Sequence, residues 1–416
     1  MTVKKKMTTP WKAVRKVLSN RRRDLLLFYT LPKAYRAHLK EPVQNNKVIL
    51  VEARLDHLDN SFAWLYKVLK EQYNVEIHIH YLQETFVPYR EYVKNCRKML
   101  ADAATARYIF LTEASNVIGC IPKRKETTIC QLWHACGAFK KFGLSTAGEL
   151  FGPDLANHRR HPYYANLDLV TVSSPEVIWA YAEAMDLKGR EEIIRPLGTS
   201  RTDVFFRDDF ISAARERLYQ VFPAARGKKV ILFAPTFRGG VSFAKTADRF
   251  DPAKLAPALS DEYVVVIKHH PLIRSLPAID PKLDGTFACD ATKSMTIEDL
   301  LCVSDLCISD YSSVIFEYSL FERPMLFFAY DLEEYFDWRG FYYDYETLTP
   351  GPVCRTHEEL VENIKRFGEG FDPSEVRQFK ERFMSACDGR CTDRILKEVF
   401  GGDLAKLQKD PPYGIV

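Results

Sequence analysis

One stretch of the chain decides the fold, and it runs Ser304-Asp-Leu-Cys-Ile-Ser-Asp-Tyr-Ser-Ser-Val-Ile-Phe-Glu-Tyr-Ser-Leu-Phe-Glu-Arg-Pro-Met-Leu-Phe-Phe-Ala-Tyr-Asp331. Its pattern predicts a buried strand over 306–308, a polar turn over 309–313 and a helix over 314–321. The first N–H groups of a helix lack partners within it and carry partial positive charge, so the hydroxyls of Ser312 and Ser313 favour binding of a phosphate there. A plain helix cap by either serine explains the same pattern.

Apolar runs alternate with helical stretches on the N-terminal side of that stretch and around it. The predicted strands are 47–51, 75–81, 106–111, 128–133, 229–234, 263–268, 306–308 and 325–328. The predicted helices are 61–73, 89–101, 252–259, 296–302, 314–321 and 391–400. This alternation is typical of parallel sheets joined by crossover helices, so we predict an α/β protein with two Rossmann-like lobes.

The predicted lobes span 46–215 and 216–400, between a basic segment, 1–45, and a short tail, 401–416. The boundary is placed in the charged stretch 208–228. Ligands of open α/β sheets bind beyond the carboxyl ends of the strands. We therefore expect the active site in the cleft between the two lobes.

Composition narrows the possible classes of protein. Hydrophobic residues make up 46% of the 416, enough for two cores, but no run of about 18 apolar residues and no signal-peptide pattern occurs. We therefore expect a cytoplasmic protein. The ten cysteines include no Cys-x-x-Cys pair and no His at zinc-ligand spacing, which predicts free thiols and no metal ligands.

Basic residues are concentrated in the first 40 positions. Twelve Lys or Arg and one acid give this segment a net charge of +11, whereas the remainder carries −7 of the total +4. Within it Trp11, Val14, Val17 and Leu18 recur at helical spacing. A basic amphipathic helix binds anionic bilayers, so we predict peripheral attachment to the inner face of the cell membrane. A solvated tail is the alternative, and nucleic-acid binding is disfavoured because the aromatic and glycine patterns of RNA-binding modules are absent.

The order of motifs resembles the CDP-glycerol glycerophosphotransferases that build teichoic acids. Beside the opening stretch, the motifs are Gln131-Leu-Trp-His-Ala-Cys-Gly-Ala-Phe-Lys140, Gly198-Thr-Ser-Arg-Thr-Asp203, Leu232-Phe-Ala-Pro-Thr-Phe-Arg238, Val266-Ile-Lys-His-His-Pro271, Arg339-Gly-Phe-Tyr-Tyr-Asp344 and Asp388-Gly-Arg-Cys-Thr-Asp-Arg394. The resemblance covers roughly residues 100 to 400. It implies a GT-B arrangement of the lobes. It also implies transfer of glycerol phosphate from CDP-glycerol to a hydroxyl of a lipid-linked teichoic-acid or capsular polymer, with release of CMP.

Two histidines carry the catalytic roles that the resemblance implies. His134 is expected to deprotonate the acceptor hydroxyl, and His270 to contact the pyrophosphate as CMP leaves. His269 is adjacent to His270 and would point to the opposite face of a strand, so only one of the two is expected to serve. The loop after His134 is one residue longer than the family's commoner His-Gly-Thr-Pro-Leu-Lys.

The other predicted site residues are cations, hydroxyls and acids. Binding of the donor phosphates is predicted for Ser312, Ser313, Asp310, Lys268, Arg238, Arg339 and Thr236. Acceptor-side or interlobe roles are predicted for Lys140, Arg201 and Asp203. An assisting acid is expected at Glu176 or Glu183, and no cofactor is required by this scheme.

Three rival functions use the same motifs. CDP-ribitol could replace CDP-glycerol as donor, because the nucleotide motifs would look the same. A GT-B glycosyltransferase acting on a nucleotide sugar is more distant. A non-catalytic nucleotide-binding scaffold is a third, and the joint presence of His134, His270 and Ser312 argues against it.

Overall fold

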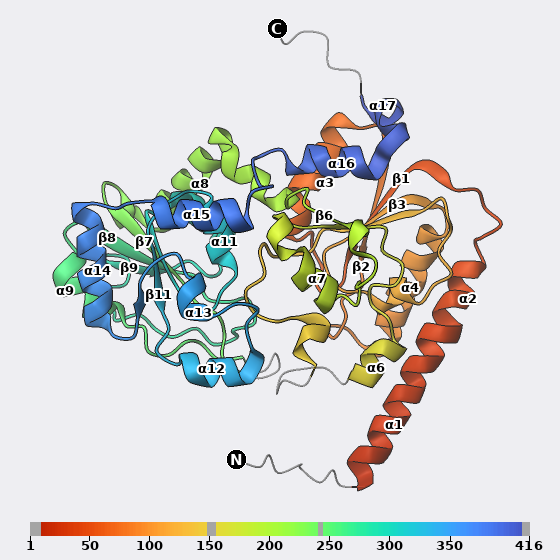
Figure 1. Cartoon of the computed structure of the whole chain (residues 1–416), viewed down its shortest axis with the longest axis horizontal. Helices are drawn as coiled ribbons and strands as arrows, with labels where there is room; N and C mark the ends of the chain where they lie inside the picture. Colours follow the sequence, from red (N-terminus) through yellow and green to blue (C-terminus); the bar gives the residue numbers. More distant parts are fainter. Residues whose placement is uncertain (1–9, 148–154, 240–243, 410–416) are drawn as a thin grey trace. The chain divides into compact units, whose positions relative to one another are not determined.

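Two parallel β-sheets form the framework of the protein (Figure 1). The computed structural model describes residues 10–147, 155–239 and 244–409, and within these ranges it leaves out the side chains of 10–16, 157 and 336–339. The predicted α/β class with two parallel sheets is confirmed. The predicted strand limits agree with the observed ones to within about three residues.

The first sheet has six strands in the order β2-β1-β3-β4-β5-β6. The strands are β1 Gln44–Glu52, β2 Glu76–Tyr81, β3 Ala106–Leu111, β4 Thr128–Gln131, β5 Leu169–Thr171 and β6 Ile194–Arg195. The α-helices of this part of the chain are α1 Pro10–Leu25, α2 Leu31–Arg36, α3 Asn60–Gln72, α4 Tyr89–Ala103, α5 Asn116–Gly119, α6 Leu155–Arg160, α7 Ile178–Ala184 and α8 Asp208–Val221. The last six residues of β1 are buried, as expected of a central strand covered on both faces.

The second sheet also has six strands, in the order β12-β11-β10-β7-β8-β9. The strands are β7 Lys229–Ala234, β8 Tyr263–Ile267, β9 Ala288–Asp290, β10 Leu306–Ser309, β11 Met325–Phe328 and β12 Val353–Cys354. The helices are α9 Pro252–Leu259, α10 Ile297–Val303, α11 Val314–Ser319, α12 Leu332–Arg339, α13 Tyr345–Leu348, α14 His357–Glu369, α15 Ser374–Phe383, α16 Cys391–Phe400 and α17 Leu404–Leu407. The helix predicted over 314–321 therefore ends two residues early, at Ser319.

One face of the second sheet is closed by α9 and α14, which lie side by side in Figure 1. Leu255 and Leu259 of α9, with Leu360 and Ile364 of α14, are buried against strand residues such as Ile308. Capping boxes start α10 at Thr296 and α14 at Thr356, because each threonine accepts the N–H of an acid three residues on. Packing and caps thus hold the strand ends in register.

The described residues form two compact units. One lies within 1–133, 154–170 and 396–416, and the other within 134–153 and 171–395. The loop that begins at His134 therefore belongs to the same unit as the second sheet. The lobe limits predicted from the sequence, including the segment 1–45 and the tail 401–416, stay a prediction.

Among the described residues, no helix is both long and apolar enough to cross a membrane. The helix predicted in the basic segment 1–45, called the basic head below, is present as α1. It continues through a π-helical turn, Leu26–Thr30, into α2. Val17 and Leu18 of α1 are exposed, whereas Leu27 and Tyr35 are buried in the first unit. This segment therefore has both exposed apolar residues and residues that belong to the core.

Candidate active site

Most of the predicted donor-binding residues lie at one edge of the second sheet. Thr236 and Arg238 follow β7, Lys268 to His270 follow β8, and Asp310 to Ser313 follow β10. These strands pair in parallel, so their carboxyl ends meet at the same edge. The structure therefore brings together residues that are up to 77 positions apart in the sequence.

Arg238 is the centre of a partly buried ion-pair network at this edge. Its guanidinium donates to Asp331 through Nε (2.6 Å) and Nη2 (3.0 Å), and to Asp310 through Nη1 (2.8 Å). The rings of Tyr311, Tyr330 and Tyr335 lie within 6 Å of it. The pKa of Arg238 is raised by the two carboxylates, although burial opposes them. Arg238 was predicted as a phosphate ligand, but here its donors are directed at two acids of the protein.

Asp310 arranges the turn that leads into α11. One carboxylate oxygen, Oδ1, accepts the backbone N–H of Thr236 (2.8 Å), the Thr236 hydroxyl (3.0 Å) and the N–H of Tyr311 (2.6 Å). The Asp310 side chain is almost fully buried, and these three contacts show that its carboxylate shapes the turn, whereas its role in phosphate binding stays a prediction. Sequence reasoning missed Asp331, the second partner of Arg238, although it ends the opening stretch.

The two serines of the turn differ in their contacts. The Ser312 hydroxyl lies 3.4 Å from the N–H of Val314, at the start of α11. Ser313 is the N-cap residue of α11, but its side chain makes no capping hydrogen bond. Both side chains are partly exposed. The helix-cap alternative therefore fits Ser312 better than Ser313.

The two histidines after β8 occupy different environments. His269 is buried, 5% exposed, and burial lowers the pKa of its imidazole. His270 is partly exposed, and its Nδ1 accepts the N–H of Leu272 at 3.2 Å. In the neutral ring the proton is then on Nε2, which can donate to an anion. Lys268 donates to the carbonyls of Thr292 (2.7 Å) and Met295 (2.5 Å), and burial lowers the pKa of its ammonium group.

His134 follows a residue with unusual backbone geometry. Trp133, directly before it, has φ +61°, which a bulky residue adopts only where the surrounding structure imposes it, commonly at functional sites. The carbonyl of His134 accepts a hydrogen bond from Arg201 Nη1 at 2.8 Å. The His134 side chain is partly exposed.

Arg201 contacts the backbone of His134 and two acids. Its Nη2 donates to Glu298 at 2.6 Å, and its Nε lies 3.6 Å from a carboxylate oxygen of Glu317. Burial raises the pKa of Glu317, and the Arg201 charge opposes that rise. Asp203, two residues on, accepts the N–H groups of Cys391 and Thr392 at the start of α16 (2.9 and 2.8 Å). Both residues thus hold backbone segments in place.

The loop after His134 packs on α11. The Phe139 ring lies 6.2 Å from that of Phe316 and stacks on Tyr345 at 5.6 Å, and the Tyr345 hydroxyl donates to the carbonyl of Asp310 (3.0 Å). Gly137 has φ +63°, and a Cβ at this position would come within 2.4 Å of the Phe316 ring. Glycine is thus required for the approach. The His134 loop and the turn over 309–313, which is the predicted donor-side turn, belong to one compact unit.

The roles of the remaining predicted residues, Lys140, Arg339, Glu176 and Glu183, stay predictions. Lys140 forms an antiparallel bridge with Phe341, and its ammonium lies 6.0 Å from the Tyr335 ring. The Arg339 side chain lies outside the described residues. Of the two candidate acids, Glu176 accepts hydrogen bonds from Arg382 (2.6 Å) and Tyr343 (3.1 Å), whereas Glu183 lies near Lys188 (3.2 Å).

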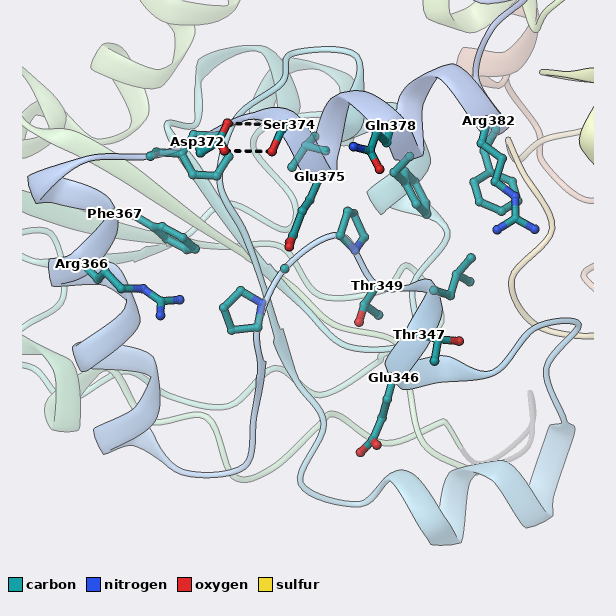
Figure 2. Close-up of a pocket in the computed structure, with 18 of the residues that line it drawn as sticks. Glu346, Thr347, Thr349, Arg366, Phe367, Asp372, Ser374, Glu375, Gln378 and Arg382 are labelled. Carbon is teal, nitrogen blue, oxygen red and sulfur yellow. Dashed lines mark hydrogen bonds between the residues drawn. The ribbon is translucent and has the colours of Figure 1, made fainter.

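A pocket of about 820 Å³ lies elsewhere in the same unit (Figure 2). Residues 346–352 line it together with side chains of α14 and α15, among them Arg366, Glu375 and Gln378. Gly351 on its wall lies against the carbonyl of Met325, which is the first residue of β11. The pocket therefore reaches the amino end of that strand, and none of the predicted site residues lines it.

Comparison with known proteins assigns the family. The family model described as CDP-glycerol:poly(glycerophosphate) glycerophosphotransferase matches residues 33–401. The chain belongs to this family and is an enzyme of it. The prediction is confirmed, and the match extends some 70 residues further toward the N-terminus than the motifs did.

The curated relatives carry both glycerol and ribitol names. The teichoic acid ribitol-phosphate primase of Bacillus spizizenii is 36% identical over 85% of this chain and 90% of its own length. The teichoic acid glycerol-phosphate primase of Bacillus subtilis is 31% identical over 70% of this chain and 71% of its own. The ribitol-phosphate polymerase TarL of Staphylococcus aureus is 32% identical over 88% of this chain. The match covers only 63% of the length of TarL.

A solved structure of the wall teichoic acid polymerase TagF has a similar fold. Its TM-score to this chain is 0.73, with 21% identity over 96% of this chain and 99% of that one. This likeness confirms the predicted two-lobed α/β fold.

Proposed function

We propose that the chain transfers a polyol phosphate group from a CDP-linked donor to a hydroxyl of a lipid-linked teichoic-acid or capsular polymer. CMP is the other product. The packing of the His134 loop on the α11 segment supports this proposal most directly. Because of it, a candidate base and the turn over 309–313 lie in the same compact unit.

The proposed reaction is a single displacement at phosphorus. His134 accepts the proton of the acceptor hydroxyl, whose oxygen forms a bond to the phosphorus that bears the polyol. The bond from that phosphorus to the bridging oxygen breaks, and CMP leaves with the bonding electrons. His270 Nε2 and the Ser313 hydroxyl donate to the phosphate oxygens as their charge grows. The scheme assigns no step to a cofactor.

The donor is proposed to be CDP-glycerol, with CDP-ribitol as the second candidate. The motif order supports glycerol through the family's description. A specific observation favours ribitol, because the ribitol-phosphate primase is 36% identical to this chain and the glycerol-phosphate primase 31%.

A donor panel tests the proposal. The protein is incubated with one lipid-linked acceptor and, separately, CDP-glycerol, CDP-ribitol and a UDP-sugar, and the products are identified by mass spectrometry. One CDP-polyol is expected to add its polyol phosphate mass to the acceptor. A product formed only from the UDP-sugar would instead support the glycosyltransferase alternative.

The serines of the turn give a paired test of donor binding. Ser313→Ala is expected to weaken donor binding by about 1.5–3 kcal/mol, the value of a hydrogen bond to a charged group, and to leave stability unchanged because its hydroxyl caps nothing. Ser312→Ala is expected to lower stability instead, by about 0.5–1 kcal/mol, through loss of a cap contact. Calorimetric titration with the donor and chemical denaturation separate the two. Equal donor affinity in wild type and Ser313→Ala would assign the turn to capping alone.

Peripheral membrane attachment is proposed for the exposed side of α1 and the turn after it. Leu18, Leu25 and Tyr29 are each at least 59% exposed, and basic residues surround them. The side chains of Trp11 and Val14 lie outside the described residues. Because Leu26, Leu27, Leu31 and Tyr35 are buried, deleting the whole head would damage the first unit, so substitutions at exposed positions make the better test.

The triple variant Leu18→Ser/Leu25→Ser/Tyr29→Ser is expected to lose most of its binding to anionic vesicles, because those side chains supply the apolar contact. Wild-type binding should weaken steeply as salt is raised, since charges are screened beyond about 8 Å at physiological ionic strength. Co-sedimentation measures both effects. Phe86→Ser, which removes a 64% exposed ring outside the head, is the control. Equal sedimentation of the triple variant and wild type would remove the head from the proposal.

A further inference from the structure

Two histidines and an aspartate form a compact cluster in the first unit, apart from the proposed reaction. His78 and His80 are two positions apart on β2, so their side chains point to the same face of the sheet. Asp102 comes from the last turn of α4. One nitrogen from each histidine and a carboxylate oxygen of Asp102 all lie within 4.8 Å of one another.

His78 lies between two carboxylates. Its Nε2 is 2.6 Å from Glu76 Oε1, and its Nδ1 is 3.1 Å from Asp102 Oδ2. A lone pair on Nδ1 and a carboxylate oxygen are both acceptors, so either a shared proton or a metal ion between them accounts for the second contact.

His80 provides the second nitrogen. Its Nε2 lies 2.8 Å from the same oxygen, Asp102 Oδ2. The side chain is buried, 7% exposed. An imidazole nitrogen is a common ligand of metal ions.

Neighbouring groups hold the three ligands in position. Lys47 Nζ donates to the other oxygen of Asp102, Oδ1, at 2.9 Å and to the Thr105 hydroxyl at 3.0 Å. This fixes the carboxylate with Oδ2 toward the histidines. The Glu76 contact to His78 Nε2 matches the carboxylate that commonly supports a metal-bound histidine.

We propose that His78 Nδ1, His80 Nε2 and Asp102 Oδ2 bind a divalent transition-metal ion of the Zn²⁺ type. Bonds of about 2.0–2.1 Å in tetrahedral geometry separate neighbouring ligand atoms by roughly 3.3 Å, close to the 2.8 and 3.1 Å contacts seen here. The ion replaces the proton that the His78 and Asp102 acceptors otherwise share. Two imidazoles and one carboxylate leave a fourth coordination position for water. The bound ion would cross-link α4 to β2, because its ligands come from both elements.

Metal binding to the full chain tests this proposal without any assay of transfer. The protein is stripped with a chelator and titrated with Zn²⁺ against a chromophoric competitor, with its cysteines blocked so that thiolates do not bind the metal. One tight site per chain is expected, together with a higher thermal-unfolding midpoint. Both should be lost in the double variant His78→Ala/His80→Ala. His57→Ala is the matched control, because His57 also lies 2.8 Å from a carboxylate, that of Asp56.

The variant Glu76→Gln keeps all three ligands. It therefore tests the site even if the double variant loses zinc binding because it folds poorly. It is expected to bind Zn²⁺ about 10–100-fold more weakly than wild type, because the supporting carboxylate is lost. Zinc stoichiometry and affinity equal to wild type in the double variant, or wild-type affinity in Glu76→Gln, would overturn the proposal and assign the cluster to a proton-held ion pair.

Discussion

Replacing His134 by Ala is expected to lower the turnover number about 10²–10⁴-fold, because the acceptor hydroxyl loses its general base. Donor affinity should be nearly unchanged, since in the proposed scheme this imidazole acts on the acceptor. Turnover is measured with saturating donor and a lipid-linked acceptor, and donor affinity by calorimetry. His57→Ala, a change at an exposed histidine, is the control.

A lower turnover number with unchanged donor affinity is the result that identifies His134 as the base. The Arg201 hydrogen bond reaches the His134 carbonyl, so the backbone position is held without the imidazole and Ala at this site should not disturb the donor-side turn. A His134→Ala protein that turns over normally, or one that loses donor binding along with rate, would remove His134 from the base role.

The His270→Ala variant is expected to lose both turnover and donor affinity, the latter about 10–100-fold. This corresponds to the loss of one hydrogen bond to a charged phosphate, about 1.5–3 kcal/mol. The N–H of Leu272 bonds to Nδ1, so the neutral ring has its proton on Nε2, the atom that the proposed scheme assigns to the phosphate. Titration with the CDP-linked donor and steady-state kinetics measure the two effects.

His269→Ala is the matched neighbour for that experiment. His269 is buried with a lowered pKa, so its loss should reduce stability and leave donor affinity near that of wild type. If the His269 variant lost donor affinity and the His270 variant kept it, the two assignments would have to be exchanged.

The sheets could be predicted from the sequence because their central strands are continuous apolar runs. Strands β7 and β11 match the predicted limits, and helix α9 does as well. Strand β9, Ala288–Asp290, ends in a charged residue and is buried only at Ala288, and β12 has only two residues, so neither forms a continuous apolar run. Their places depend on pairing with β8 and β11.

The candidate site was only partly predictable because its charges pair across long distances in sequence. Arg238 was predicted to bind phosphate, with a salt bridge as the alternative, and the sequence offered no means of choosing because its carboxylate partners, Asp310 and Asp331, are 72 and 93 residues away. Arg201 likewise reaches the carbonyl of His134, 67 residues upstream. Residue type and motif order located these side chains, and only the fold shows which of them neutralise one another.

The basic head shows a second reason why the sequence alone could not predict the structure fully. A stripe of apolar residues among Lys and Arg fits a membrane surface and a packed helix equally well. In the structure Leu26 and Leu27 are buried while Leu25 and Tyr29 are exposed, so one segment contains both kinds of surface. Periodicity could not separate them, because burial here depends on contacts with the rest of the first unit.

The position of bond cleavage tests the central claim most directly. A CDP-polyol labelled with ³²P on the phosphate next to the polyol is incubated with the protein and a lipid-linked acceptor. The proposed displacement predicts that the label moves to the polymer and that one CMP is released for each polyol phosphate added. Release of labelled CDP, with the polymer gaining polyol without phosphate, would contradict the account.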